Sequence, residues 1–129
     1  MNRAVIGLGS NIDRDNHIAQ ARKRLCRAHR VLAESRFVET EPVGFRDQPR
    51  FLNGAVLIET EMTRHILEEW LHQTEIELGR VRGPNRCGPR TIDLDLVVWN
   101  GDIIDQDVRK RAFLRQAILE VLPDLEIKT

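Results

Sequence analysis

The chain has 129 residues, enough for one domain with a hydrophobic core and too few for two. Its 20 basic and 20 acidic residues give a formal net charge of zero, which argues against a general nucleic-acid-binding protein, because such proteins carry a basic field. No stretch has the length of a membrane span and no signal-peptide pattern is present. We therefore expect a single cytosolic domain over residues 1–129, with no membrane partner.

The N-terminal part of the chain predicts a strand followed by a helix. Residues 4–8 form an apolar run typical of a buried strand, and Gly9-Ser10-Asn11 after it is typical of a plain turn. A helix is expected from about residue 15 to 29, capped by Asp13 or Asp15. Its predicted buried side chains are Ile18, Ala21, Leu25, Cys26 and Ala28.

Extended segments and a loop follow this helix. Residues 31–40 are rich in β-branched residues and predict extended structure, and 41–49 form a long loop of turn-forming residues, which suits a functional role. Residues 51–59 predict the next strand. Alternation along it places Phe51, Asn53, Ala55 and Leu57 on one face, and Leu52, Val56 and Ile58 on the other.

The second half of the chain again predicts a helix and then a strand. Thr63 can cap a helix that runs to Leu78 and stops at Gly79. A strand over 92–99, an Asn100-Gly101 hairpin turn with a short extended run at 103–104, and a last helix over about 109–121 follow. In the helix that follows Thr63, the side chains predicted to face the core are Ile66, Leu67, Trp70, Leu71 and Thr74.

The order β-α-β-β-α-β predicts an α+β, ferredoxin-like split βαβ fold with an antiparallel sheet, a short extra hairpin strand and a C-terminal helix. We expect the helices on one face of this sheet. The other face would be open and would carry Phe51, Asn53, Asp93 and Asp95.

Residues 80–95 carry the clearest chemical signal. A Gly- and Pro-rich loop with four arginines leads into a strand on which Asp93 and Asp95 share a face, while Leu94, Leu96 and Val98 point to the core. Adjacent carboxylates repel unless a cation or proton lies between them, and arginines suit a polyphosphate. The loop and strand therefore predict a magnesium–phosphate site.

Other interpretations of these residues stay open at this point. The chain has no P-loop, and Ile12 stands where a dinucleotide fingerprint needs its third glycine. Two aspartates can be solvated residues of a surface strand, although their apolar neighbours favour a partner such as Arg90 or a divalent ion. Phe51 and Asn53 suit a flat heterocycle with donors and acceptors, but they equally fit a core ring and an amide near a turn.

Several motifs together resemble the 6-hydroxymethyl-7,8-dihydropterin pyrophosphokinase family of folate biosynthesis. They are Gly9-Ser10-Asn11, Asp47-Gln48-Pro49 before Phe51-Leu52-Asn53, Gly79-Arg80-Val81-Arg82, Gly88-Pro89-Arg90-Thr91-Ile92-Asp93-Leu94-Asp95, Arg111-Ala112-Phe113 and Pro123-Asp124-Leu125. The resemblance covers nearly the whole chain.

The resemblance implies a ferredoxin-like enzyme that transfers the terminal diphosphate of ATP to the hydroxymethyl group of 6-hydroxymethyl-7,8-dihydropterin, using two Mg²⁺ ions. By position, Asp93 and Asp95 would ligate both ions, and Arg80, Arg82 and Arg90 would act on the phosphates. The pterin would be bound by Thr40, Pro42, Val43, Phe51, Asn53 and Phe113. The nucleotide would be bound by His72, Glu75, Arg86, Arg90, Arg109, Lys110 and Arg111.

The chain departs from the family pattern in three places. Cys87 stands where many members have a tryptophan, Phe51 replaces a frequent tyrosine, and the segment between Asp105 and Arg111 lacks a Pro-His-Pro-like stretch that holds ATP. Two hypotheses follow: a compact active enzyme in which Arg109 and Lys110 supply the lost contacts, or a binding protein for pterin or nucleotide with weak or no turnover. An RNA-binding split-βαβ domain is disfavoured by the absence of Tyr and the zero net charge.

Overall fold

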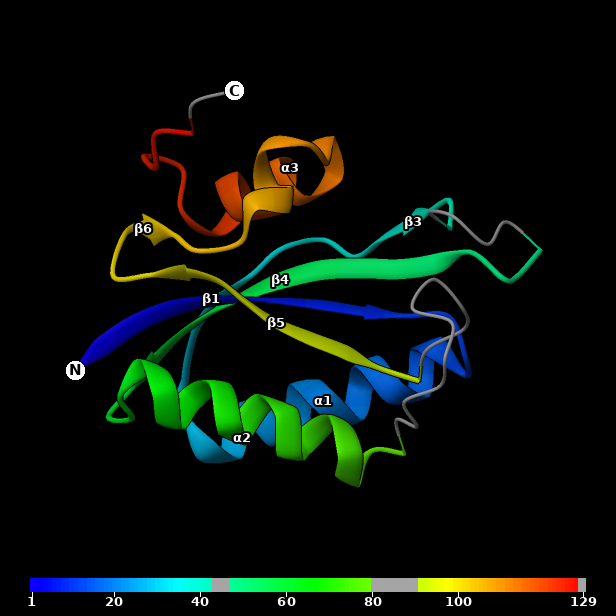
Figure 1. The fold of residues 1–129 in the computed structure, drawn as a ribbon, viewed down its shortest axis with the longest axis horizontal. Helices are drawn as coiled ribbons and strands as arrows, with labels where there is room; N and C mark the ends of the chain where they lie inside the picture. The colour runs from blue at the N-terminus through cyan, green and yellow to red at the C-terminus, as the bar shows by residue number, and fades with distance from the viewer. Residues whose placement is uncertain (43–46, 80–90, 128–129) are drawn as a thin grey trace.

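A six-stranded sheet and three α-helices make up the described part of the chain, which is residues 1–42, 47–79 and 91–127 of a computed structural model (Figure 1). In chain order the elements are β1 (Asn2–Ser10), α1 (Arg14–Ala28), β2 (Arg30–Glu34), β3 (Val38–Thr40), β4 (Phe51–Thr60), α2 (Arg64–Glu77), β5 (Asp93–Trp99), β6 (Asp102–Ile103), a 3₁₀ turn η1 (Gln106–Arg109) and α3 (Ala112–Val121).

The sheet has the strand order β2-β4-β1-β5-β6, with β3 also paired to β4, and every pair is antiparallel. Helices α1 and α2 cover one face (Figure 1). This confirms the α+β ferredoxin-like fold, the extra hairpin strand and the C-terminal helix. The expectation that all helices share one face is wrong, because α3 packs on the opposite face and covers part of it.

Two hydrophobic cores lie on the two faces. The core beneath α1 and α2 contains Ala4, Ile6, Leu8, Ile18, Ala21, Leu25, Val56, Ile58, Leu67, Leu71, Leu78, Ile92, Leu94 and Leu96. The core beneath α3 contains Val5, Ala55, Leu57, Val97, Val98, Val108, Ala117, Ile118 and Val121. Alternate residues of β1 and β4 enter different cores, as strand periodicity requires.

A β-bulge in β5 changes which face its side chains enter. Val5 pairs with Val98 and the next residue, Ile6, pairs with Leu96, so Val97 is an extra residue. Leu94 and Leu96 face α2 as predicted, but Val98 joins Val97 in the core beneath α3. The prediction that Val98 shares a face with Leu94 is therefore wrong, because simple alternation fails at the bulge.

The ends of α2 agree with the sequence prediction, whereas Asp13 precedes α1 without forming the predicted side-chain cap. Thr63 Oγ1 accepts a hydrogen bond from the backbone N–H of Ile66 at the start of α2, and Gly79 follows the helix with φ +97°. Cys26 and Ala28 of α1, predicted as buried, are exposed. Ile66 of α2, predicted in the inner stripe, is 47% exposed. Within the described ranges, no helix is both long and apolar enough to span a membrane.

Candidate active site

A row of residues crosses the three central strands at the end of β1. Gly9 is the register partner of Asn53 on β4 and of Asp93 on β5, and Gly7, one step along, pairs with Ala55 and Asp95. Two strand spacings separate the outer members, about 10 Å. Because glycine has no side chain, the strand between the amide and the carboxylates leaves the surface open at this point.

Gly9 is required at its position by the side chain of Asn53. A Cβ built on Gly9 would lie 2.5 Å from Asn53 Oδ1, which is closer than real Cβ atoms come to any neighbour. The Asn53 amide also donates a hydrogen bond to Thr40 Oγ1 over 2.5 Å, so β3 fixes its orientation. The Asn53 amide is therefore held in one orientation above Gly9, and we call the surface of β1 at Gly7 and Gly9 the glycine floor.

Asp93 and Asp95 lie on the same side of the sheet, as alternation predicts, and both line a small hollow of about 70 Å³. The start of α3 forms its other wall with Arg111 and Phe113, and Asn53 completes it. The structure thus brings together five predicted site residues that come from three separate parts of the sequence. Asn53, Asp93, Asp95, Arg111 and Phe113 are these five.

The short segment before α3 adds two carboxylates that sequence reasoning did not place in the site. Asp105 and Asp107 both line the small hollow, and Asp105 Oδ1 accepts a hydrogen bond from the backbone N–H of Asp107 over 2.9 Å. The Asp107 carboxylate lies 3.6 Å from the Arg111 guanidinium, one helical turn along. This spacing in the sequence is the signal that could have identified the pair.

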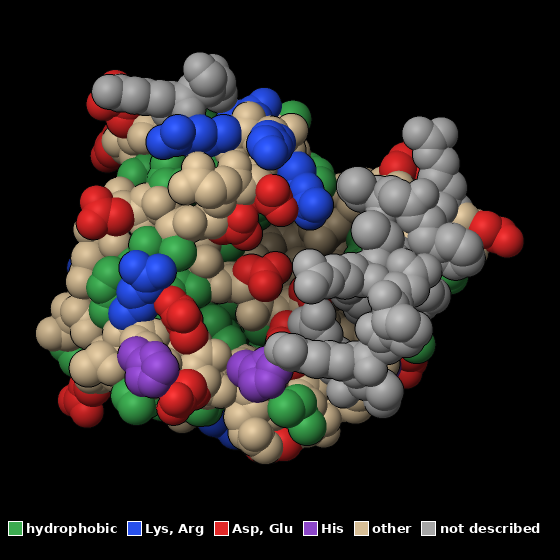
Figure 2. All heavy atoms as spheres, in the orientation of Figure 1, with side chains coloured by type: hydrophobic (Ala, Val, Ile, Leu, Met, Phe, Trp, Pro, Cys, Tyr) green, Lys and Arg blue, Asp and Glu red, His purple; other side chains and the backbone are tan. Residues whose placement is uncertain are grey.

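A larger hollow of about 440 Å³ lies between α2 and the outer edge of β5, and it shares Asp95 and Asp105 with the small one. His72 and Glu75 of α2 line it. Glu75 is 5% exposed, and its Oε2 accepts the backbone N–H of Leu94, between the two aspartates, over 2.8 Å. On the face drawn in Figure 2, acidic side chains gather around a hollow, with basic side chains above it and histidines below.

The remaining predicted site residues either line neither of these two hollows or lie outside the described ranges. Phe51 is half-buried at the start of β4, opposite Thr40, and Pro42 is buried. On β3, next to Thr40, Glu39 accepts a hydrogen bond from Arg14, and this bond lowers the pKa of the Glu39 carboxyl. Arg109 and Lys110 are exposed and line neither described hollow. Val43, Arg80, Arg82, Arg86 and Arg90 lie outside the described residues.

The prediction of a plain turn at Gly9-Ser10-Asn11 is wrong for its first two residues, because Gly9 and Ser10 are the last residues of β1 and pair with β4. Ser10 and Asn11 are 0% and 4% exposed, although serine and asparagine are mostly surface residues. Their side chains bond to segments on both sides of the site. Three neighbouring turn-forming residues gave no signal of this burial, which comes from tertiary packing.

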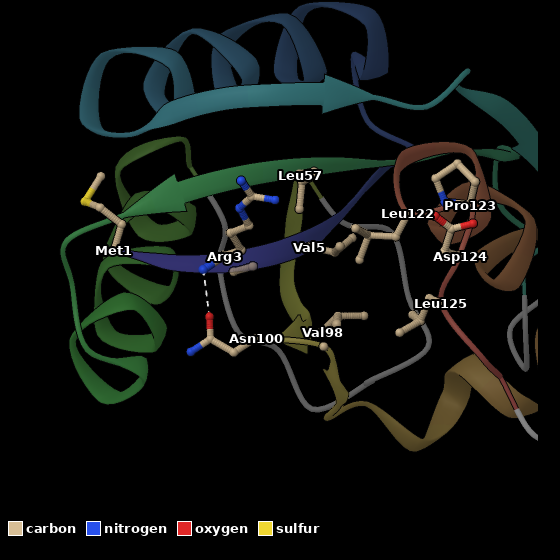
Figure 3. A pocket seen from close by; sticks show the side chains of 12 residues that line it. Met1, Arg3, Val5, Leu57, Val98, Asn100, Leu122, Pro123, Asp124 and Leu125 are labelled. Carbon is tan, nitrogen blue, oxygen red and sulfur yellow. Dashed lines mark hydrogen bonds between the residues drawn. The ribbon is translucent and has the colours of Figure 1, made fainter.

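A third hollow, of about 410 Å³, lies at the opposite end of β1 and is mostly apolar (Figure 3). Val5, Leu57 and Val98 reach it from the sheet, and Leu122 and Leu125 from the segment after α3. With few polar groups, this hollow offers little to a phosphate or a metal ion.

Comparison with known proteins decides the family. The family model for 7,8-dihydro-6-hydroxymethylpterin-pyrophosphokinase (HPPK) matches residues 5–123. The chain belongs to the HPPK family. It is 42% identical to 2-amino-4-hydroxy-6-hydroxymethyldihydropteridine pyrophosphokinase of Methylorubrum extorquens, with 98% of this chain and 87% of that protein aligned.

Two further HPPK relatives carry the same name. The Bacillus subtilis protein is 39% identical, over 97% of this chain and 81% of its own length. The Pseudomonas aeruginosa protein is 33% identical, over 97% of this chain and 83% of its own length. The matched range of the HPPK model includes both hollows next to Asp95, the glycine floor and the start of α3.

Proposed function

We propose that this protein transfers diphosphate from ATP to the hydroxymethyl group of 6-hydroxymethyl-7,8-dihydropterin in folate biosynthesis, with release of AMP. The observation that carries the proposal is the row Asn53–Gly9–Asp93, which sets an oriented amide beside paired carboxylates in a chain of the HPPK family. The amide would recognise the pterin heterocycle, and the acidic pair would face the phosphates of ATP. The row therefore offers groups for both substrates.

The amide side of the row suits the pterin. Asn53 offers both a donor and an acceptor to the edge of a flat heterocycle, and Thr40 holds its orientation. Phe113 lies across the small hollow, and Phe51 lies on the Asn53 face of β4. We assign these two rings to stacking on the pterin, and Pro42 and Val43 to further contacts with it.

The acidic pair suits magnesium. Within the described part of the chain, no group of three or more histidine, cysteine or acidic side chains gathers as a complete metal cage. Asp93 and Asp95 share one face, and Mg²⁺ is typically bound by one or two carboxylates, keeps several waters and binds substrate phosphates. We propose that Asp93 and Asp95 hold two Mg²⁺ ions. When bound, the ions would neutralise phosphate charge at the transferred group.

The larger hollow suits the nucleotide of ATP. His72 and Glu75 line it beside Asp95, and the Glu75 bond to Leu94 fixes the strand that carries the acidic pair. Arg111 lines the smaller hollow, which shares Asp95 and Asp105 with this one. We assign Arg80, Arg82, Arg86 and Arg90 to the phosphates, and Arg109 and Lys110 to the outer part of the nucleotide site.

The main contribution of the protein to this reaction would be to align its two substrates. The hydroxyl oxygen of the pterin forms a bond to the β-phosphorus of ATP, the bond from that phosphorus to the α,β-bridging oxygen breaks, and AMP leaves with the electron pair. The hydroxyl proton is lost to solvent. Such transfers depend on in-line positioning and on charge stabilisation more than on covalent help.

The test is an assay of AMP release by the purified protein, with ATP and 6-hydroxymethyl-7,8-dihydropterin, in the presence and absence of Mg²⁺. We expect stoichiometric AMP and diphosphorylated pterin only with the metal. Pterin binding without any AMP would overturn the proposal. We further propose that the reaction takes place in the cytoplasm, where ATP is available.

A further inference from the structure

We infer that Ser10 and Asn11 are positioning residues, which hold the acidic strand β5 and the pterin-facing strand β4 at a fixed separation. The inference rests on the proposed function and adds to it two residues that need not touch either substrate. It comes from where the backbone pairing of β1 ends.

Strand pairing to β1 stops at the site. The last pair between β1 and β5 is Gly9 with Asp93, and the last pair between β1 and β4 is Ser10 with Leu52. Asp93 and Asn53 are therefore within one residue of the end of each ladder. Beyond these pairs β1 no longer restrains β5 or β4 through backbone hydrogen bonds, although β4 still pairs with β3 from Phe51 to Asn53.

Side-chain bonds continue the connection beyond each ladder. The Ser10 hydroxyl donates to the backbone carbonyl of Thr91 over 2.5 Å, two residues before Asp93. The Asn11 amide donates one hydrogen to Gln48 Oε1 over 2.8 Å and the other to the carbonyl of Pro49 over 3.0 Å, two residues before Phe51. Ser10 thus holds the residues that precede Asp93, and Asn11 holds the residues that precede Phe51.

Burial makes these bonds matter. Both side chains are almost completely buried, so they satisfy their polar groups through these bonds rather than through water. Because Ser10 and Asn11 share a peptide bond, a shift of one segment is passed directly to the other. The pair therefore sets the distance between the carboxylates and the pterin face.

The test compares three variants with the wild type. Ser10→Ala removes the bond to Thr91, Asn11→Leu removes both bonds to the β4 side at similar volume, and Gln48→Ala removes one of them from a half-exposed partner. Gln48→Ala keeps the test valid if Asn11→Leu does not fold. The measurements are kcat, KM for ATP, the pterin Kd and the thermal midpoint.

We expect Ser10→Ala and Asn11→Leu to lower kcat by about 10- to 100-fold with the pterin Kd and the KM for ATP within about twofold, because misalignment costs rate rather than binding. Gln48→Ala should lower kcat less. In the double variant Ser10→Ala/Asn11→Leu, kcat should fall by less than the product of the two single-variant factors. The reason is that both residues maintain the same distance between the carboxylates and the pterin face.

The matched control is Ser35→Ala. Ser35 is also buried, at 7% exposure, and its hydroxyl also bonds two backbone groups, accepting from Ala55 N and donating to Arg36 O. It should lose stability and keep the wild-type kcat. Wild-type kcat in folded Ser10→Ala and Gln48→Ala, or an equal loss of kcat in Ser35→Ala, would overturn the positioning role. Absence of AMP from the wild type would instead overturn the proposed function.

Discussion

The two ends of β1 carry hollows of opposite chemistry on the same face of the sheet. At the amino end, Ala4, Val5, Leu57 and Val98 line an apolar hollow of about 410 Å³ (Figure 3). Polar groups there bond to one another, as when Asn100 Oδ1 accepts the N–H of Arg3. At the carboxyl end, carboxylates, an amide and an arginine line the surface.

The difference comes from single positions on β1. Val5, Gly7 and Gly9 point to the same face, but only Val5 has a side chain to bury. The valine packs in the core under α3, whereas Gly9 leaves room for the Asn53 amide and Gly7 leaves room for Val97 and Leu114. The size of these β1 residues thus distinguishes the two ends of the strand. We call the end with the apolar hollow the structural end, and the end with the carboxylates is the candidate active site.

The largest effect is expected from Asp95→Ala. Loss of a proposed metal-ligating carboxylate should reduce AMP formation by about 100-fold or more, at unchanged fold, as removal of electrostatic stabilisation does elsewhere. A steady-state AMP assay with circular dichroism measures both. The control is Asp102→Ala, which removes an exposed acid on β6 at the structural end and should keep full activity. Undiminished turnover in Asp95→Ala would remove the metal role.

A smaller loss is expected from Gly9→Ala. The new methyl group must displace the Asn53 amide, so pterin affinity should fall by about tenfold, since one well-placed hydrogen bond is lost. Calorimetric titration with the pterin measures this. Gly101→Ala, in the turn at the structural end with φ +86°, should lower stability and leave pterin affinity intact. Equal pterin affinity in Gly9→Ala and wild type would contradict the packing argument.

At the structural end the expected effect is on stability. Val98→Ala enlarges the apolar hollow and should lower the free energy of unfolding by about 2 kcal/mol without changing kcat. Urea denaturation measures the change. The exposed control, Val38→Ala on β3, should shift it by less than about 0.5 kcal/mol. A fall in kcat for Val98→Ala would mean that the two ends are coupled.

The smallest effect concerns pH. His29 is buried next to Thr60, its Nε2 has no hydrogen-bond partner among the described residues, and burial lowers the pKa of its imidazole. The unfolded state therefore binds more protons, so stability is complete above about pH 6.5 and falls as the pH drops below it. Denaturation curves at several pH values should show this slope in wild type and in His65→Gln, and a reduced slope in His29→Leu. An unchanged slope in His29→Leu would assign it to other groups.

The sequence was sufficient for the strand and helix order, the α2 cap at Thr63 and the shared face of Asp93 and Asp95, because these depend on local periodicity and turn chemistry. It could not provide the third helix's position, since an amphipathic segment does not state which face of a sheet it covers. The burial of Ser10 and Asn11, and the place of Asp105 and Asp107, depend on segments far apart in the chain. For the same reason the exposed sides of α1 and α2 were partly misassigned.

The extra residue at Val97 has a consequence for how this strand can change. The bulge lets β5 present two acids and then two consecutive valines to the same side, so its first part serves a ligand and its second part a core. A deletion within 96–98 would restore strict alternation and rotate either the acids or the valines to the wrong surface. A change of length within β5 therefore disturbs one of these two roles, whereas a substitution can preserve both.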